Sequence, residues 1–138
     1  MSRPRRITRS LLAGTLGLAF AFVAASADAA DWSKAKTVTV VTVEYRFEPS
    51  ALKFHSGVVY RLHLDNRGKE THEFTAPAFF KTIEMRDAGV VNADRTEIVI
   101  QPGEEKDLFF VAGRPGHYAL TCSDHDWAGM VGSIAVVP

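Results

Sequence analysis

From residue 36 to residue 137 the chain is a succession of short runs in which every second residue is apolar. Turn-forming segments such as Glu48-Pro49-Ser50 and Asn66-Arg67-Gly68 separate these runs. A period of two is typical of β-strands that bury one face. We predict strands at 37–47, 51–54, 58–64, 72–74, 96–100, 108–111, 118–122 and 131–137. Many short strands divided by turns predict an all-β fold, a β-sandwich or barrel.

Three segments depart from simple alternation. In 37–47 the apolar positions change phase between Val40 and Val41, which predicts a β-bulge. Residues 108–111 are apolar at every position, so we expect a strand in the interior of a sheet. The segment 77–89 is irregular, and its apolar residues could line one face of a short helix or of a packed loop. Those residues are Phe79, Phe80 and Ile83.

Residues 1–29 have a different character from the rest of the chain. Residues 3–9 carry four arginines, residues 11–25 are apolar or small, and Ala27-Asp28-Ala29 matches a cleavage site. This pattern predicts a secretory signal peptide at 1–29, too short to span a bilayer stably, with a retained N-terminal anchor as the alternative. Arg5-Arg6 leaves twin-arginine export open, but its neighbours favour the general secretory route. We therefore expect an exported, periplasmic domain at 30–138.

The predicted domain has 109 residues, enough for one domain with a real core. Four of the 16 basic residues and one of the 16 acidic residues lie in 1–29, so 30–138 has a net charge of −3. A mildly acidic domain does not support binding to nucleic acid or a polybasic contact with membranes. No catalytic Ser-His-Asp order, paired-carboxylate pattern or phosphate-binding glycine loop stands out. We expect a monomeric binding protein without enzymatic activity.

The only cysteine stands in the pattern Cys122-x2-His125-x4-Met130. With five His and three Met in the chain, this spacing has a chance probability of roughly 8 × 10⁻⁴. Thiolate, imidazole and thioether are the ligand types of a mononuclear copper site that transfers electrons. Such a site needs a second histidine, and His72 is well placed to supply it. The alternative is a buried structural cysteine with an unrelated His and Met.

Export narrows the role of this cysteine. A lone cysteine cannot form a disulfide within the chain, although exported proteins usually pair theirs. An unpaired cysteine there is an intermolecular bridge, a reactive thiol or a metal ligand. The neighbouring His and Met favour the metal ligand.

The run 115–134, PGHYALTCSDHDWAGMVGSI, resembles the C-terminal copper loop of plastocyanins and pseudoazurins, which are cupredoxins, or blue copper proteins. Phe47-Glu48-Pro49, Gly57 and Asn66 resemble the opening strands of the broader family. The resemblance implies a Greek-key β-sandwich with one Cu(I)/Cu(II) ion at one end. It implies a one-electron carrier between periplasmic redox proteins. The implied copper ligands are His72, Cys122, His125 and Met130.

One position departs from the family pattern. Cupredoxins often have Asn directly after the first ligand histidine, whereas this chain has Glu73. Its His-Glu-Phe run also resembles the cupredoxin-like domains of periplasmic iron-uptake proteins. Glu73 could accept a hydrogen bond behind the ligands, bind the metal itself or be solvated. Trp127, inside the copper loop, could shield the metal, belong to a docking patch or pack beneath the loop.

Two classes of function follow from the sequence. The first is the soluble electron carrier. The second is a copper-handling or metal-uptake accessory protein that stores, delivers or oxidises metal. A copper oxidase is less favoured, because it normally needs an open coordination position or further copper centres, and the chain has few histidines to spare.

Overall fold

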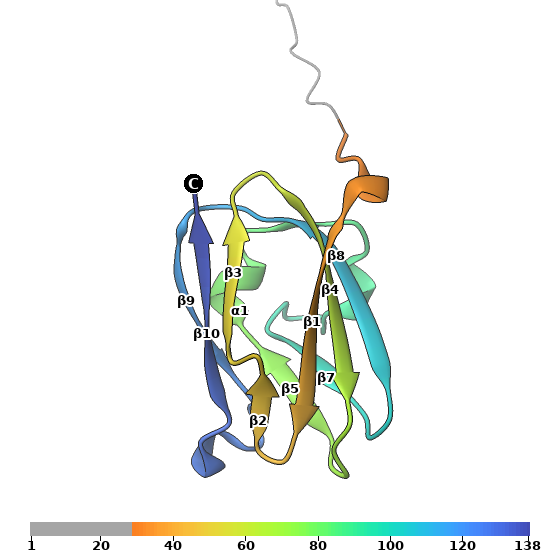
Figure 1. Ribbon diagram of the computed structural model, residues 1–138, viewed down its shortest axis with the longest axis vertical. Coiled ribbons are helices and arrows are strands. Elements are labelled where there is room, and N and C mark those ends of the chain that lie inside the picture. Colours follow the sequence, from red (N-terminus) through yellow and green to blue (C-terminus); the bar gives the residue numbers. More distant parts are fainter. Residues whose placement is uncertain (1–28) are drawn as a thin grey trace, which may run out of the picture.

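A computed structural model describes residues 29–138 as two five-stranded β-sheets packed face to face (Figure 1). Residues 1–28, which hold nearly all of the predicted signal peptide, lie outside the described residues. The first sheet has the strand order β2-β1-β4-β8-β6. Its strands are β1 (Lys36–Val43), β2 (Arg46–Glu48), β4 (Val59–Asn66), β6 (Glu84–Met85) and β8 (Glu105–Val111). The all-β prediction is confirmed.

The second sheet has the strand order β3-β10-β9-β5-β7. Its strands are β3 (Ala51–His55), β5 (His72–Thr75), β7 (Glu97–Ile100), β9 (Gly116–Thr121) and β10 (Val131–Val137). From β2 to β9, successive strands alternate between the sheets, which is the crossing pattern expected of the predicted Greek-key sandwich. The helical turns are η1 (Trp32–Lys34), α1 (Pro77–Phe80), η2 (Ala88–Val90) and η3 (Asp126–Ala128). Within 29–138, no helix has the length and apolar character needed to cross a membrane.

The alternation of the sequence explains how the strands bury their inner faces. In β4, Tyr60, Leu62 and Leu64 lie in the core, while Arg61 and His63 point outward and contact Asp107 on β8. The prediction that 108–111 forms a strand in the interior of a sheet is also confirmed, because β8 lies between β4 and β6. The segment 77–89 begins with the single turn of α1, and its three apolar residues named above are all buried.

The predicted β-bulge is wrong. The ladder between β1 and β4 runs without interruption from Lys36, opposite Tyr60, to Thr42, opposite Asn66. Thr42 is fully buried and continues the inward phase of Val40, so a polar residue in a core position hides the true alternation. The chain then turns into β2 instead of extending to residue 47.

An aromatic cluster fills one part of the core. The ring centroid of Phe54 lies 5.2 Å from that of Phe110 and 4.8 Å from that of Tyr60, both edge to face. Phe79 packs 5.5 Å from Phe110. Such pairs contribute energy beyond the burial of their area.

We expect Phe54→Ala to lower the free energy of unfolding by about 3–5 kcal/mol, because it leaves a cavity among fully buried rings. Urea unfolding followed by circular dichroism measures this. Lys53→Ala, which removes an exposed side chain of the same strand, is the matched control and should change stability by less than about 0.5 kcal/mol. Equal effects of the two changes would contradict the central place of Phe54 in the core.

Strand pairing brings the candidate ligands to one end of the second sheet. His72 is the first residue of β5, and Cys122 directly follows the last residue of β9. The two strands meet at the pair Thr75 and Thr121. The loop between β9 and β10, which contains η3, closes the same end of the sandwich, at the bottom of Figure 1.

Candidate metal centre

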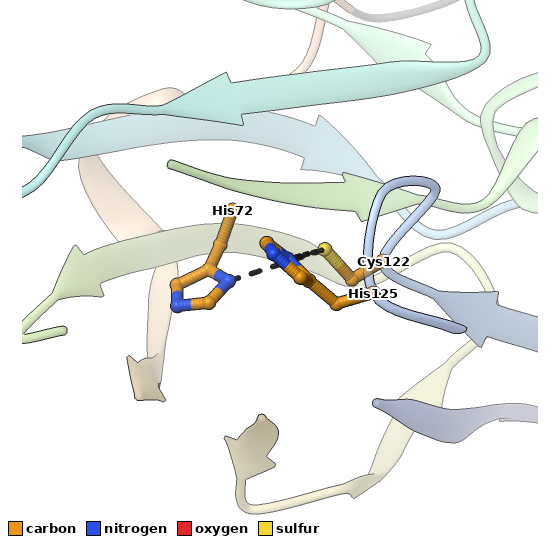
Figure 2. A group of neighbouring side chains, drawn as sticks. All are labelled: His72, Cys122 and His125. Carbon is orange, nitrogen blue, oxygen red and sulfur yellow. Dashed lines mark hydrogen bonds between the residues drawn. The ribbon is translucent and has the colours of Figure 1, made fainter. Parts of the chain in front are cut away.

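Three potential metal ligands converge beneath the β9–β10 loop. Nδ1 of His125 lies 3.4 Å from Sγ of Cys122, and Nδ1 of His72 lies 4.0 Å from the same sulfur (Figure 2). The ligand atoms of these three residues all lie within 4.8 Å of one another. The structure thus brings together three of the four residues singled out from the sequence.

Backbone hydrogen bonds fold the loop so that its ligands face inward. His125 N–H donates to Cys122 O at 3.2 Å, and Cys122 N–H donates to Met130 O at 3.0 Å. Gly129 has φ of 81°, a left-handed conformation that glycine adopts without strain. The result is a short closed loop whose first and last residues are bonded to each other.

Met130, the fourth predicted ligand, sits at the closed end of this loop. Its side chain is fully buried, and its N–H donates to His125 O at 3.3 Å. Its backbone is therefore tied to both Cys122 and His125. Its role as a ligand stays a prediction.

The donor atoms lie in a dry environment. Cys122 and His72 are fully buried, and Cys122 is a free thiol. Burial raises the pKa of the Cys122 thiol to about 11, and the hydrogen bond from the thiol to the Glu73 side chain adds to the rise. Burial also lowers the pKa of His72, with a further contribution from nearby His125. A metal entering here meets a neutral His72 imidazole and must displace the proton of the Cys122 thiol.

This donor set fits a copper ion. A soft thiolate and two imidazoles are ligands that copper binds strongly in both oxidation states. Nε2 of His72 is buried without a hydrogen-bond partner among residues 29–138, whereas its Nδ1 faces the sulfur. The two rings present their Nδ1 atoms to one common point, as a mononuclear site requires.

Glu73 lies against the sulfur. Its backbone N–H donates to Cys122 Sγ at 3.4 Å, and its Oε2 accepts from the thiol at 3.0 Å and from Asp124 N–H at 3.4 Å. The residue is only 4% exposed. The solvated alternative for Glu73 is therefore wrong, which leaves a carboxylate that either supports the ligands or joins them.

The structure adds residues that the sequence did not single out. Oε2 of Glu70 lies 2.9 Å from Nε2 of His125, and the ring of Tyr45 packs 4.9 Å from the His125 ring. Oε1 of Glu44 lies 3.8 Å from Nε2 of His72. These residues come from the β1–β2 turn and the β4–β5 loop, and no sequence spacing marked them.

Trp127 is 77% exposed, which rules out the expectation that it packs beneath the loop. Its Nε1–H donates to Asp124 O at 2.9 Å, and its ring centroid lies 6.0 Å from that of Tyr45. An exposed indole thus stands on the loop that carries His125.

Comparisons with known proteins agree with this fold. A family model described as a cupredoxin-like domain matches residues 14–136. Reduced auracyanin from the photosynthetic bacterium Roseiflexus castenholzii is 22% identical, with a TM-score of 0.57 over 75% of this chain and 99% of that one. Auracyanin B is 23% identical, with a TM-score of 0.55 over 74% of this chain and 88% of that one.

A multicopper oxidase from Campylobacter jejuni shares the fold as well. It is 16% identical, with a TM-score of 0.57 over 75% of this chain but only 30% of that one. A search among proteins with curated descriptions finds no significant match. At these identities, the similarities to solved structures establish the fold alone.

Proposed function

The chain belongs to the cupredoxin-like family, and we propose that it is a blue-copper protein that carries single electrons between periplasmic redox proteins. The observation that carries the proposal is the convergence of one ligand atom each from His72, Cys122 and His125 within 4.8 Å, with His72 and Cys122 fully buried. The periplasmic location rests on the predicted signal peptide at 1–29. The working domain is then 30–138, acting as a monomer.

We assign the copper ligands as His72, Cys122, His125 and Met130. Copper bound there would supply a Cu(I)/Cu(II) couple. Three of the four ligands lie on one loop closed by backbone hydrogen bonds, and the fourth begins a strand. Such a loop holds the donors in nearly the same positions in both oxidation states, which keeps the cost of electron transfer low.

His125 gives this site its nearest approach to the surface. Its side chain is 12% exposed, whereas His72, Cys122 and Met130 are fully buried. The ring of Tyr45 packs against His125, and the ring of Trp127 lies next to Tyr45. We assign electron exchange with partner proteins to this edge of the molecule.

A carrier fits this chain better than an enzyme does. Among residues 29–138, the three-ligand group is the one cluster of histidine, cysteine and carboxylate donors close enough to hold a metal. An oxidase would need an open position or further copper centres. The auracyanins match almost entirely along their length, whereas the oxidase matches over less than a third of its chain.

Glu73 favours a second candidate function, metal handling. A buried carboxylate 3.0 Å from the sulfur places a hard oxygen donor beside a soft one. Such a pair suits a site that accepts or passes on metal ions of more than one kind.

Spectra of residues 30–138 loaded with copper test both candidates. A blue site shows an intense Cu(II)–thiolate band in the visible spectrum and a matching electron paramagnetic resonance signal. Reversible voltammetry without copper loss supports the carrier, whereas release of copper to a chelator on each reduction supports metal handling. Absence of the thiolate band would overturn the blue-copper assignment.

We expect Met130→Leu to keep the copper and the colour and to raise the reduction potential. A thioether donates weakly to Cu(II), so its removal disfavours the oxidised state. The rise should be about 60 mV for each tenfold loss of Cu(II) affinity relative to Cu(I). Voltammetry of this variant beside Met85→Leu, a methionine on β6 of the other sheet, gives the measurement and its control. A fall in potential, or loss of all copper, would contradict a weak axial role for Met130.

A further inference from the structure

The outer edge of His125 is covered by two side chains from elsewhere in the fold. Its Nδ1 faces the sulfur of Cys122, while Nε2 on the far side of the ring lies 2.9 Å from Oε2 of Glu70. Tyr45 packs against the ring, and its hydroxyl donates to Oε1 of Glu70 at 3.1 Å. One oxygen of Glu70 thus contacts the imidazole, and the other is held by Tyr45.

The loop that carries Glu70 is itself fixed from two sides. Oε1 of Glu44 accepts hydrogen bonds from the backbone N–H groups of Lys69 and Glu70, the second at 3.0 Å. These bonds lower the pKa of Glu44, the one from Lys69 most strongly. On the other side, Nδ2 of Asn66 donates to Glu70 O and to Ile100 O, both at 2.8 Å. Glu70 therefore stands on a braced segment, although its side chain is 48% exposed.

Gly68 allows this loop to pass close to the site. A Cβ at Gly68 would lie 2.5 Å from Oε1 of Glu44 and 3.0 Å from Nε2 of His72. A side chain at this position would push Glu44 away from the two N–H groups that it holds. Glycine at this position thus leaves room for the hydrogen bonds between Glu44 and the loop.

A carboxylate on the far nitrogen changes what an imidazole does for a metal. When the carboxylate accepts Nε2–H, the proton stays on that nitrogen, and Nδ1 keeps its lone pair for the metal. The same contact orients the ring and makes it a stronger donor. A stronger donor stabilises Cu(II) more than Cu(I), because the oxidised ion has the higher charge. In the part of the chain that the structure describes, His72 lacks such a partner, since Oε1 of Glu44 is 3.8 Å away and Nε2 of His72 makes no hydrogen bond.

We propose that Glu70, held by Tyr45 and Glu44, is a positioning residue that fixes the orientation and tautomer of His125 and thereby lowers the reduction potential of the copper site. The proposal rests on the copper site of the proposed function. In this proposal, a residue that is not itself a copper ligand sets how strongly His125 donates to the copper.

The test compares copper-loaded 30–138 with its Glu70→Gln variant. The amide keeps the shape of the side chain but removes the charge. We expect Cu(II) to bind about tenfold more weakly while Cu(I) binding changes little, which corresponds to a rise of about 59 mV in potential. Nitrogen-15 resonances of the imidazole in the diamagnetic Cu(I) form report the tautomer, and Nε2–H of His125 should lose its protection from solvent exchange in the variant. Tyr45→Phe should change the potential in the same direction, by less.

One control variant separates positioning from a general effect of charge. Asp126→Asn removes one exposed negative charge from the β9–β10 loop that carries His125, and within residues 29–138 its side chain makes no hydrogen bond or ion pair. It should shift the potential by much less than Glu70→Gln does. Equal shifts in potential in the two variants would mean that Glu70 acts by its charge alone. An unchanged potential and exchange rate in Glu70→Gln would mean that Glu70 has no effect on the site. Either result overturns the proposal. Thermal unfolding of the metal-free proteins checks that each variant folds.

Failure of the proposed function would be recognised separately. Wild-type protein without a Cu(II)–thiolate band removes the copper site and this proposal with it. A blue wild-type protein whose Glu70→Gln variant behaves identically removes only the role of Glu70.

Discussion

Cys122→Ser should abolish the visible charge-transfer band of the copper-loaded protein completely. The band requires a Cu(II)–thiolate bond, and Cys122 is the only cysteine in the chain, so no other residue can supply the thiolate. A serine hydroxyl is also a poor ligand for copper, so binding should weaken strongly. Titration with Cu(II), followed by absorption and electron paramagnetic resonance, measures both effects.

The substitution should leave the fold in place. Cys122 lies at the margin of the sandwich, directly after β9, and a serine hydroxyl could still donate to Oε2 of Glu73 as the thiol does. His117→Ala is the matched control, because it removes an exposed potential ligand on β9 outside the three-ligand cluster. That variant should keep full colour. A fully coloured Cys122→Ser protein would rule out the assignment of the site.

The sequence predicted most of the sandwich because its strands bury one face. The alternation in 58–64 corresponds directly to the inward Tyr60, Leu62 and Leu64 of β4. The error at β1 has the same origin. Thr42 occupies a fully buried position, and hydrophobicity alone does not place a polar residue in the core. Because the alternation of apolar residues continues beyond Val43, the predicted strand runs past the turn between β1 and β2.

The metal centre was predictable to the extent that it is local. Cys122 and His125 lie three residues apart, so their spacing alone marks them. His72 is fifty residues away, and it joins them because β5 and β9 pair in the second sheet. Tyr45 and Glu70 were not predicted, because a turn and a loop meet there only through the parallel register of β1 and β4. No periodicity in the sequence encodes such a contact.

Glu73 shows how the structure sharpens an open question from the sequence. Resemblance to cupredoxins identified the residue as a departure but could not say where its carboxylate points. The side chain proves to be buried against the sulfur, with the backbone N–H of the same residue also directed at Cys122. One residue thus brings a hydrogen-bond donor and a carboxylate to a single ligand atom. The backbone N–H lowers the pKa of the Cys122 thiol, whereas the carboxylate raises it.

We expect Glu73→Gln to raise the reduction potential on the order of 100 mV while the blue colour is retained. A buried negative charge beside the metal favours Cu(II) over Cu(I), and the amide removes it without changing the shape. Two unit charges about 6 Å apart interact by roughly 3 kcal/mol at an effective dielectric of about 20. That energy changes an affinity about a hundredfold. At 59 mV for each tenfold change, it corresponds to a shift on the order of 100 mV. Voltammetry at two salt concentrations measures the shift, which should depend little on salt because the group is buried.

The spectrum of the same variant separates the two remaining roles of Glu73. If the carboxylate only supports the ligands, the potential moves and the thiolate band keeps its position. If it binds the metal, the band shifts as well, because the ligand set has changed. Glu84→Gln, an exposed carboxylate on β6 of the other sheet, is the matched control and should alter neither. A potential unchanged in Glu73→Gln would show that this carboxylate carries no charge beside the copper, and would defeat the electrostatic argument.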